Sequence, residues 1–166
     1  EAAAVMACDY EVIPLLVNAL RGDPFMGKFA ALGLANLAQV EAHRQRIRAH
    51  GGLSVLAASA LSKDVVRTKH ACIALANMSL SDGRFQNIFL ASGVIERLVK
   101  LSYKADEQVR DHIGVLLCYL AVGGHTLLLQ SLVVKGVIEA ILAMRKRSSR
   151  AAAADDRGMS ESWKSG

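Results

Sequence analysis

Few residues of this 166-residue chain are placed to carry out chemistry. His70 and His112 could bind a metal ion, but no carboxylate or cysteine stands at ligand spacing on the same helical face, so packed or solvated histidines are expected. The sequence has no Gly-x-Ser-x-Gly, Walker or His-Glu-x-x-His motif, and neither Cys72 nor Cys118 has a partner histidine at a readable spacing. We therefore expect no catalysis, no metal and no cofactor, and cysteines that pack as small apolar side chains.

One polar residue stands inside an apolar run, in the stretch Ile73-Ala-Leu-Ala-Asn-Met-Ser-Leu80. A buried carboxamide without a hydrogen-bond partner costs about 1 to 3 kcal/mol. Asn77 must therefore have a fixed local partner, such as the backbone of a neighbouring element, or lie on a helix face that is not core. The first alternative makes Asn77 a structural residue, and the second makes it a binding residue.

The surroundings of this asparagine recur along the chain. Leu34-Ala-Asn-Leu-Ala38 precedes it by 41 residues, and Leu117-Cys-Tyr-Leu-Ala121 follows it by 42. A second marker, Gly93-Val-Ile-Glu96, recurs 43 residues later as Gly136-Val-Ile-Glu139. Independent markers that share one period of about 42 residues indicate a repeat protein.

Each repeat is predicted to hold three helices. A short first helix ends at a glycine suited to the left-handed conformation, as at Gly51 and Gly93. The second helix breaks at a polar stretch such as Ser62-Lys-Asp64, and the third and longest runs from about Val65 to Leu80 and from about Glu107 to Ala121. Apolar residues at third and fourth spacings on all three helices can be buried only by stacking neighbouring repeats. The sequence therefore predicts an all-α solenoid.

Three helices, a glycine before the second and Leu-x-Asn-Leu late in the third resemble the armadillo repeat. Ile13-Pro-x-Leu16, the three glycines and the two asparagines fit its motifs over about residues 5–144, whereas HEAT repeats usually lack that glycine and asparagine. The resemblance implies a right-handed superhelix. Its repeats would span about 1–40, 41–82, 83–124 and, in part, 125–144. Glu11 stands where the first repeat should have its glycine, which leaves the first helix of that repeat unassigned.

The same resemblance implies a binding groove. In armadillo proteins the third helices line the concave face of the superhelix, and an asparagine late in each typically bonds the backbone of an extended peptide. Asn36 and Asn77 match that asparagine, and Tyr119 takes the equivalent place in the third repeat. A carboxamide suits the role because it donates to one carbonyl and accepts from one N–H.

The neighbouring positions predict the chemistry of this groove. Its floor would consist of Leu32, Ile73 and Val115. Importin-α relatives place a tryptophan there that clasps a lysine, so the lysine clasp is absent. The edge would consist of Phe29, His70 and His112, beside Lys28, Lys69 and Asp111. An apolar floor with a mixed, titratable edge predicts an extended or helical partner segment with apolar anchors in place of a lysine-rich nuclear signal.

Residues 145–166 lose the repeat pattern and carry six Lys or Arg against three Asp or Glu. The run Arg145-Lys-Arg-Ser-Ser-Arg150 is a helix end that complements the macrodipole, a nuclear localisation patch, or a phosphorylation motif with Ser148 as acceptor. We expect a basic, disordered tail after a repeat domain that covers residues 1–144. Because that domain has nearly balanced charge, nucleic-acid binding is not favoured.

Composition limits the remaining partners and locations. No run of about 18 uninterrupted apolar residues predicts a membrane span. An odd number of scattered cysteines favours a reducing compartment, so the cytoplasm or the nucleus is expected. Neither end resembles a polar capping repeat, which predicts self-association through apolar ends. We expect a non-enzymatic scaffold that binds a protein segment and no small-molecule substrate. The alternatives are a structural segment of a cytoskeletal or transport assembly and, less favoured, a nuclear-import-type adaptor.

Overall fold

The structure is a computed structural model that describes residues 2–80, 93–105, 107–122, 136–143, 145–147 and 149, with side chains from residue 11 onward. Every regular element in those ranges is an α-helix. The labelled helices are α1 (Ala2–Gly22), α2 (Pro24–Leu37), α3 (Glu41–Ala49), α4 (Gly52–Ser59), α5 (Val65–Ser79), α7 (Val94–Lys104) and α8 (Glu107–Val122). Residues 137–143 are helical as well.

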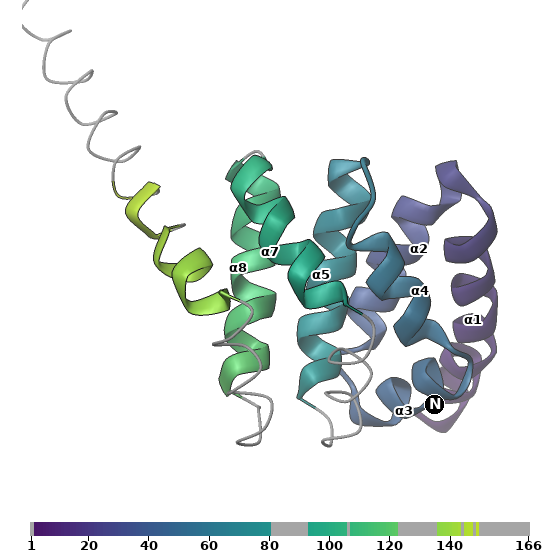
Figure 1. The fold of residues 1–166 in the computed structure, drawn as a ribbon. Coiled ribbons are helices and arrows are strands. Elements are labelled where there is room, and N and C mark those ends of the chain that lie inside the picture. The colour runs from purple at the N-terminus through teal and green to yellow at the C-terminus, as the bar shows by residue number, and fades with distance from the viewer. Residues whose placement is uncertain are drawn as a thin grey trace, which may run out of the picture.

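The helices stack as repeats along one direction, from α1 at one end to α8 and helix 137–143 at the other (Figure 1). The third helices α2, α5 and α8 pack side by side in that order. Within each repeat the preceding helix packs against the third one, α1 on α2, α4 on α5 and α7 on α8. This arrangement confirms the predicted all-α solenoid.

Three glycines set the start of the second helices. Gly51, Gly93 and Gly136 have φ values of 70°, 63° and 72°, in the left-handed region that the sequence predicts for them. A side chain there would meet the following carbonyl oxygen, at a cost of about 1 to 2 kcal/mol. Gly51 therefore turns the chain from α3 into α4, and Gly93 and Gly136 precede α7 and helix 137–143, at places where other residues would be strained.

Aspartates set the start of the third helices. Asp23 caps α2, where its side chain accepts hydrogen bonds from two backbone N–H groups of the first turn at 2.8 and 2.9 Å. Asp64 caps α5 and accepts from the N–H of Arg67 at 3.0 Å. These bonds satisfy donors that have no partner inside the helix, which fixes where α2 and α5 begin.

The first repeat differs from the second. The structure has one helix, α1, where the second repeat has a first and a second helix, α3 and α4, and Pro14 lies inside α1. Glu11 stands in place of the left-handed glycine, so the chain lacks the residue that breaks the helix in the later repeats. Pro14 removes one backbone donor but does not end the helix.

Contacts between repeats use two faces of each third helix. We call the side turned toward the next repeat the forward face and the opposite side the backward face. The forward faces consist of Gly27, Ala31, Ala35 and Ala38 on α2, Thr68, Cys72, Ala76 and Ser79 on α5, and Arg110, Gly114, Cys118 and Ala121 on α8.

Two contacts fix this assignment for α2, and the faces of α5 and α8 are assigned from the equivalent positions of the repeats. The Asn77 Nδ2 group donates to the carbonyl of Ala35 at 3.1 Å, which joins α5 to α2. A side chain added at Gly27 would come within 2.9 Å of the Arg67 guanidinium. Arg67 in turn donates to the carbonyl of Leu20 at 2.5 Å and to the Ser59 hydroxyl, so it ties the end of α1 to α4 and α5. The forward face of α2 is therefore closed by residues of the second repeat.

None of the helices in the described part of the chain is both long and apolar enough to cross a membrane.

Candidate functional site

The residues predicted for the groove lie on three neighbouring helices. They are Lys28, Phe29, Leu32 and Asn36 on α2, Lys69, His70, Ile73 and Asn77 on α5, and His112, Val115 and Tyr119 on α8. Because α5 packs between α2 and α8, equivalent positions of the three repeats follow one another across the stack. The structure thus brings the predicted residues onto one set of adjacent helices, and their binding role stays a prediction.

The predicted floor is accessible along the stack. Leu32 is 39% exposed and Val115 is 49% exposed, while Ile73 between them is half-buried. The residues next to them in sequence face the interior, as Ala31 and Leu116 show with 0% exposure. The apolar row is therefore a surface feature of the three helices and not an extension of the core.

Asn77 answers the question that its apolar surroundings raise. Its Nδ2 group is committed to the carbonyl of Ala35 in the preceding repeat. The donor group of Asn77 is therefore used structurally, in a bond to the neighbouring repeat. Its Oδ1 atom makes no hydrogen bond to the described residues. Asn36 is exposed, and in the described chain no repeat precedes α2 to offer it the same partner. The two asparagines are equivalent in sequence and differ in what they contact.

A lysine and two phenylalanines cluster at the start of α2. Lys28 Nζ lies 4.9 Å from the ring centroid of Phe25 and 5.1 Å from that of Phe29. The two rings meet edge to face at 5.8 Å, and they are 67% and 51% exposed. Phe25 was not among the residues predicted from the sequence, although its spacing of four from Phe29 on a helix is a signal that could have found it.

The two histidines of the predicted groove edge, His70 and His112, lie on the neighbouring helices α5 and α8. Burial lowers the pKa of His70, and the nearby charges of Lys69 and His112 lower it further. The Nδ1 atom of His70 is buried without a hydrogen-bond partner among the described residues. His112 Nδ1 donates to the carbonyl of Gln108 at 2.6 Å, which assigns its proton to that nitrogen. No group of three or more His, Cys, Asp or Glu capable of holding a metal occurs in the part of the chain that the structure describes.

The two described cysteines differ in their surroundings. Cys72 is fully buried, and burial raises the pKa of its thiol to about 12, so it packs as a small apolar residue as predicted. Cys118 is exposed on the forward face of α8. The expected packing is therefore found for Cys72, whereas Cys118 lies at a surface because no helix of the described chain covers that face.

An apolar hollow of about 440 Å³ lies between α8 and helix 137–143. It is lined by Gly114, Val115, Cys118, Tyr119 and Ile141, together with Asp111 and Arg145. The sequence singled out Asp111, Val115, Cys118 and Tyr119 but did not indicate the hollow, because its shape depends on which helices are present beside α8.

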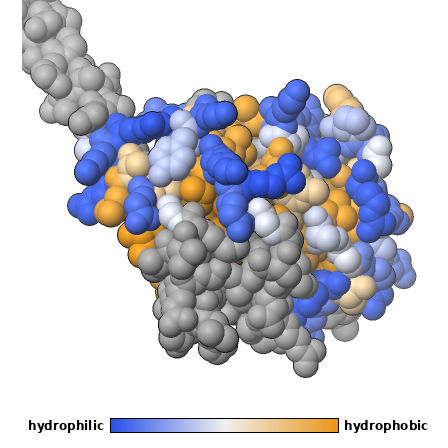
Figure 2. All heavy atoms as spheres, in the orientation of Figure 1, coloured by the Kyte–Doolittle hydropathy of each residue, from blue (hydrophilic) through white to orange (hydrophobic). Residues whose placement is uncertain are grey.

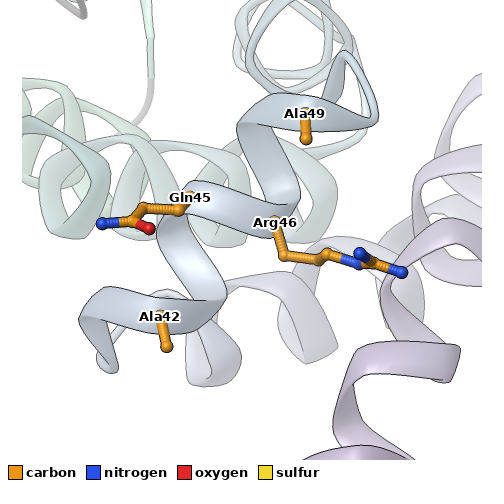
Figure 3. A pocket seen from close by; sticks show the side chains of 4 residues that line it. All are labelled: Ala42, Gln45, Arg46 and Ala49. Atoms are coloured by element: carbon orange, nitrogen blue, oxygen red, sulfur yellow. The ribbon is translucent and has the colours of Figure 1, made fainter.

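A second hollow lies along α3. It is lined by Ala42, Gln45, Arg46 and Ala49, which share one face of the helix, and the Arg46 side chain extends from α3 toward α1 (Figure 3). The four residues come from one helix and bring no nucleophile together with a base. We therefore assign no site to the hollow along α3. Figure 2 shows the molecule in the orientation of Figure 1, and on this side hydrophilic residues are interspersed with hydrophobic ones.

The basic run after residue 144 is described in part. Residues 145–147 and 149 are helical, and Arg147 donates to the backbone carbonyl of Tyr103 at 3.2 Å. Ser148, the predicted phosphorylation site, and residues 150–166 lie outside the described residues. The tail boundary and the phosphorylation site stay predictions.

Comparisons with known proteins address the fold. No protein-family model matches the sequence, and no curated protein matches it. Solved structures do match. One engineered protein has a TM-score of 0.72 and 28% identity over 85% of this chain and 36% of its own. A designed armadillo repeat protein in complex with the peptide (KR)4 has a TM-score of 0.69 and 24% identity, over 77% of this chain and 54% of its own.

The stacked helical units define a helical repeat protein. More particularly, the chain is an armadillo-like repeat solenoid, as the glycines, the third-helix row and the likeness to designed armadillo proteins agree. A structure of computationally designed armadillo repeat proteins for modular peptide recognition matches as well, with a TM-score of 0.67 and 23% identity over 77% of this chain and 54% of that one. This chain therefore spans about half the length of the designed armadillo proteins that it matches.

Proposed function

We propose that the chain is a scaffold that binds a segment of a partner protein along α2, α5 and α8. The observation that carries the proposal is the accessible apolar row of Leu32, Ile73 and Val115 on three adjacent helices. Single exposed apolar residues are common on protein surfaces, but a row that continues over several elements is typical of an interaction surface.

The partner segment carries apolar anchors. Lysine recognition by aromatic rings would need free rings, whereas the rings of Phe25 and Phe29 already face the chain's own Lys28. Lys28 and Lys69 also place positive charge at the edge, which repels a lysine-rich peptide. The designed protein bound to (KR)4 has the same fold, but fold alone does not transfer its ligand to this chain.

Isothermal titration with two peptide sets tests this proposal. One set carries leucine or phenylalanine anchors, and the other carries lysine at the same positions. We expect measurable binding of the apolar set and a weaker response from the lysine set. Val115→Glu should abolish binding of the apolar set, whereas Tyr103→Glu on α7, at a similar exposure of 44%, should not. Tighter binding of the lysine set would overturn the proposal.

One observation favours a second function, that of a structural segment without a groove ligand. The Asn77 donor is used between repeats, as a spacer would use it. A pulldown with Asn36→Ala separates the two functions because Asn36 is exposed and its loss should leave the fold intact. A groove protein loses specific partners in this variant, whereas a spacer retains every one.

A further inference from the structure

In the described part of the chain, the forward face of α8 is not covered by a third helix, as those of α2 and α5 are. On α2 and α5 the equivalent residues are buried: Ala35 is 2% exposed and Ala76 is 4% exposed. On α8 Cys118 is exposed, and Gly114 is half-buried. The forward faces of α2 and α5 are covered by the next third helix. The forward face of α8 instead borders the hollow between α8 and helix 137–143.

The space beside α8 fits a single helix. Helix 137–143 follows Gly136 as α7 follows Gly93, so it is the second helix of a fourth repeat. Val137 and Ala140 of this helix are 1% and 0% exposed, so it is already packed in place. A whole repeat, such as α1 with α2 of another copy, would need the position that helix 137–143 occupies. Within the described residues, this repeat has its second helix and no third helix.

The residues that follow in this chain do not have the sequence of that helix. The positions of Ile113 and Leu117 are fully buried in the third repeat, as are their equivalents in the two before it. At the spacing of 43 between the third and fourth repeats, Asp156 and Ser160 fall on these positions, whereas Ala152, Met159 and Trp163 fall on those of Val109, Leu116 and Leu120. An ionised carboxylate at a core position is strongly disfavoured. The segment after helix 137–143 therefore places a carboxylate where a covering third helix needs an apolar side chain.

We propose that the forward face of α8 binds an amphipathic helix of a partner protein, which completes the fourth repeat. The helices that already fill this role define its chemistry. Both α5 and α8 carry apolar residues at i, i+4 and i+7, as in Ala71, Leu75 and Met78. At i+6, α5 has an asparagine and α8 has Tyr119. An asparagine at that position would donate to the Cys118 carbonyl as Asn77 donates to the carbonyl of Ala35. This site adjoins the predicted groove, because Val115 and Tyr119 line the hollow as well, but it faces along the solenoid axis toward the next repeat.

Protection of the Cys118 thiol tests the proposal. The full chain with Cys8→Ser is mixed with a peptide of the α5 sequence, Val65–Ser79, in which serine replaces Cys72. Cys118 is then alkylated under native conditions, where the buried thiol of Cys72 in the chain reacts slowly. We expect saturating peptide to slow the alkylation of Cys118 by about tenfold or more. The same peptide with Leu75→Asp and Met78→Asp is the matched control and should give no protection.

A variant of the chain locates the bound helix. Gly114→Leu should fill the hollow and abolish peptide binding measured by fluorescence anisotropy, while Tyr103→Glu should leave it unchanged. Circular dichroism confirms that both variants are folded. Unchanged alkylation at saturating peptide, or equal protection by the control peptide, would overturn the proposal.

Two other occupants give different results. If residues 151–166 cover the face, Cys118 reacts slowly in the free chain and quickly after their deletion. If a second copy covers it, the alkylation rate falls as the chain concentration rises, and light scattering shows a dimer. Either result overturns the proposal.

Discussion

Helices α5 and α8 are equivalent in sequence position and differ in their neighbours. A third helix packs on each side of α5, whereas α8 has such a neighbour on one side only within the described chain. Ala76 on α5 is 4% exposed, and the equivalent Cys118 is exposed. Both residues are small, so the local sequence is suited to close helix packing in both places. What differs is the presence of a covering helix.

Helix α2 shows the same difference at the other end. Met78 on the backward face of α5 is 0% exposed, and the equivalent Leu37 on α2 is half-buried. In a solenoid each repeat contacts only its neighbours, so the energetic role of a residue type depends on the position of its repeat in the stack. Paired substitutions at equivalent positions can therefore separate the contribution of the repeat motif from that of the neighbour.

The largest difference is expected for truncation of the backward face. Met78→Ala should lower the free energy of unfolding by about 2 to 5 kcal/mol, because it removes a fully buried side chain between two repeats. Leu37→Ala should cost less than about 2 kcal/mol, because part of that side chain is already in water. Urea denaturation of the two variants and the wild type measures both values. Equal losses would show that the preceding repeat does not determine the contribution of this position.

Enlarging a forward-face residue should give the next largest difference. Ala76→Leu forces three extra carbon atoms between α5 and α8 and should cost about 1 to 3 kcal/mol. Cys118→Leu places the same side chain at an open face, where a change within about 0.5 kcal/mol is expected. Thermal unfolding followed by circular dichroism compares them. A loss at Cys118 as large as that at Ala76 would mean that the α8 face is already covered.

Removing the asparagines should give a smaller difference. Asn77→Ala deletes a hydrogen bond between repeats and leaves the carbonyl of Ala35 without that donor, at a cost of about 0.5 to 1.5 kcal/mol. Asn36→Ala should change stability by less than about 0.5 kcal/mol, because Asn36 is exposed. Urea midpoints of both variants give the comparison. If Asn36→Ala is the more destabilising change, the structural role assigned to Asn77 is wrong.

Much of the fold could be predicted from local sequence signals. The sequence predicted the left-handed glycines, the helix ends near Ser62-Lys-Asp64 and the third helices, because each depends on a residue type and a period. The sequence did not predict that α1 is continuous. Glu11 in place of a glycine removes the signal for a helix end, but it does not show whether one helix continues through that position. Sequence periods define repeat boundaries well where a helix-ending glycine is present and poorly where it is absent.

The site was less predictable because it depends on contacts between repeats. The sequence placed Asn77 on a third helix but left its partner open, and the partner is a carbonyl 42 residues away. The hollow beside α8 results from a covering helix that is lacking among the described residues, and no pattern within α8 indicates that. Residue types predicted which positions matter, while the neighbours determined what each position contacts.

The smallest expected effect is the pH dependence that His70 gives to the free energy of unfolding. Burial and the charges of Lys69 and His112 lower the pKa of His70 below its ordinary value of 6.5. The folded chain therefore binds fewer protons at this site than the unfolded chain, so the contribution to stability is present above pH 6.5 and is lost as the pH falls from there toward the folded pKa. His70→Gln removes the titrating group and should flatten that part of the stability curve. Urea midpoints measured from pH 7.5 to about pH 5 test this, with His50→Gln at an exposed position outside the groove as the control. If His70→Gln loses stability with acid as steeply as the wild type and the control, His70 is not the group responsible.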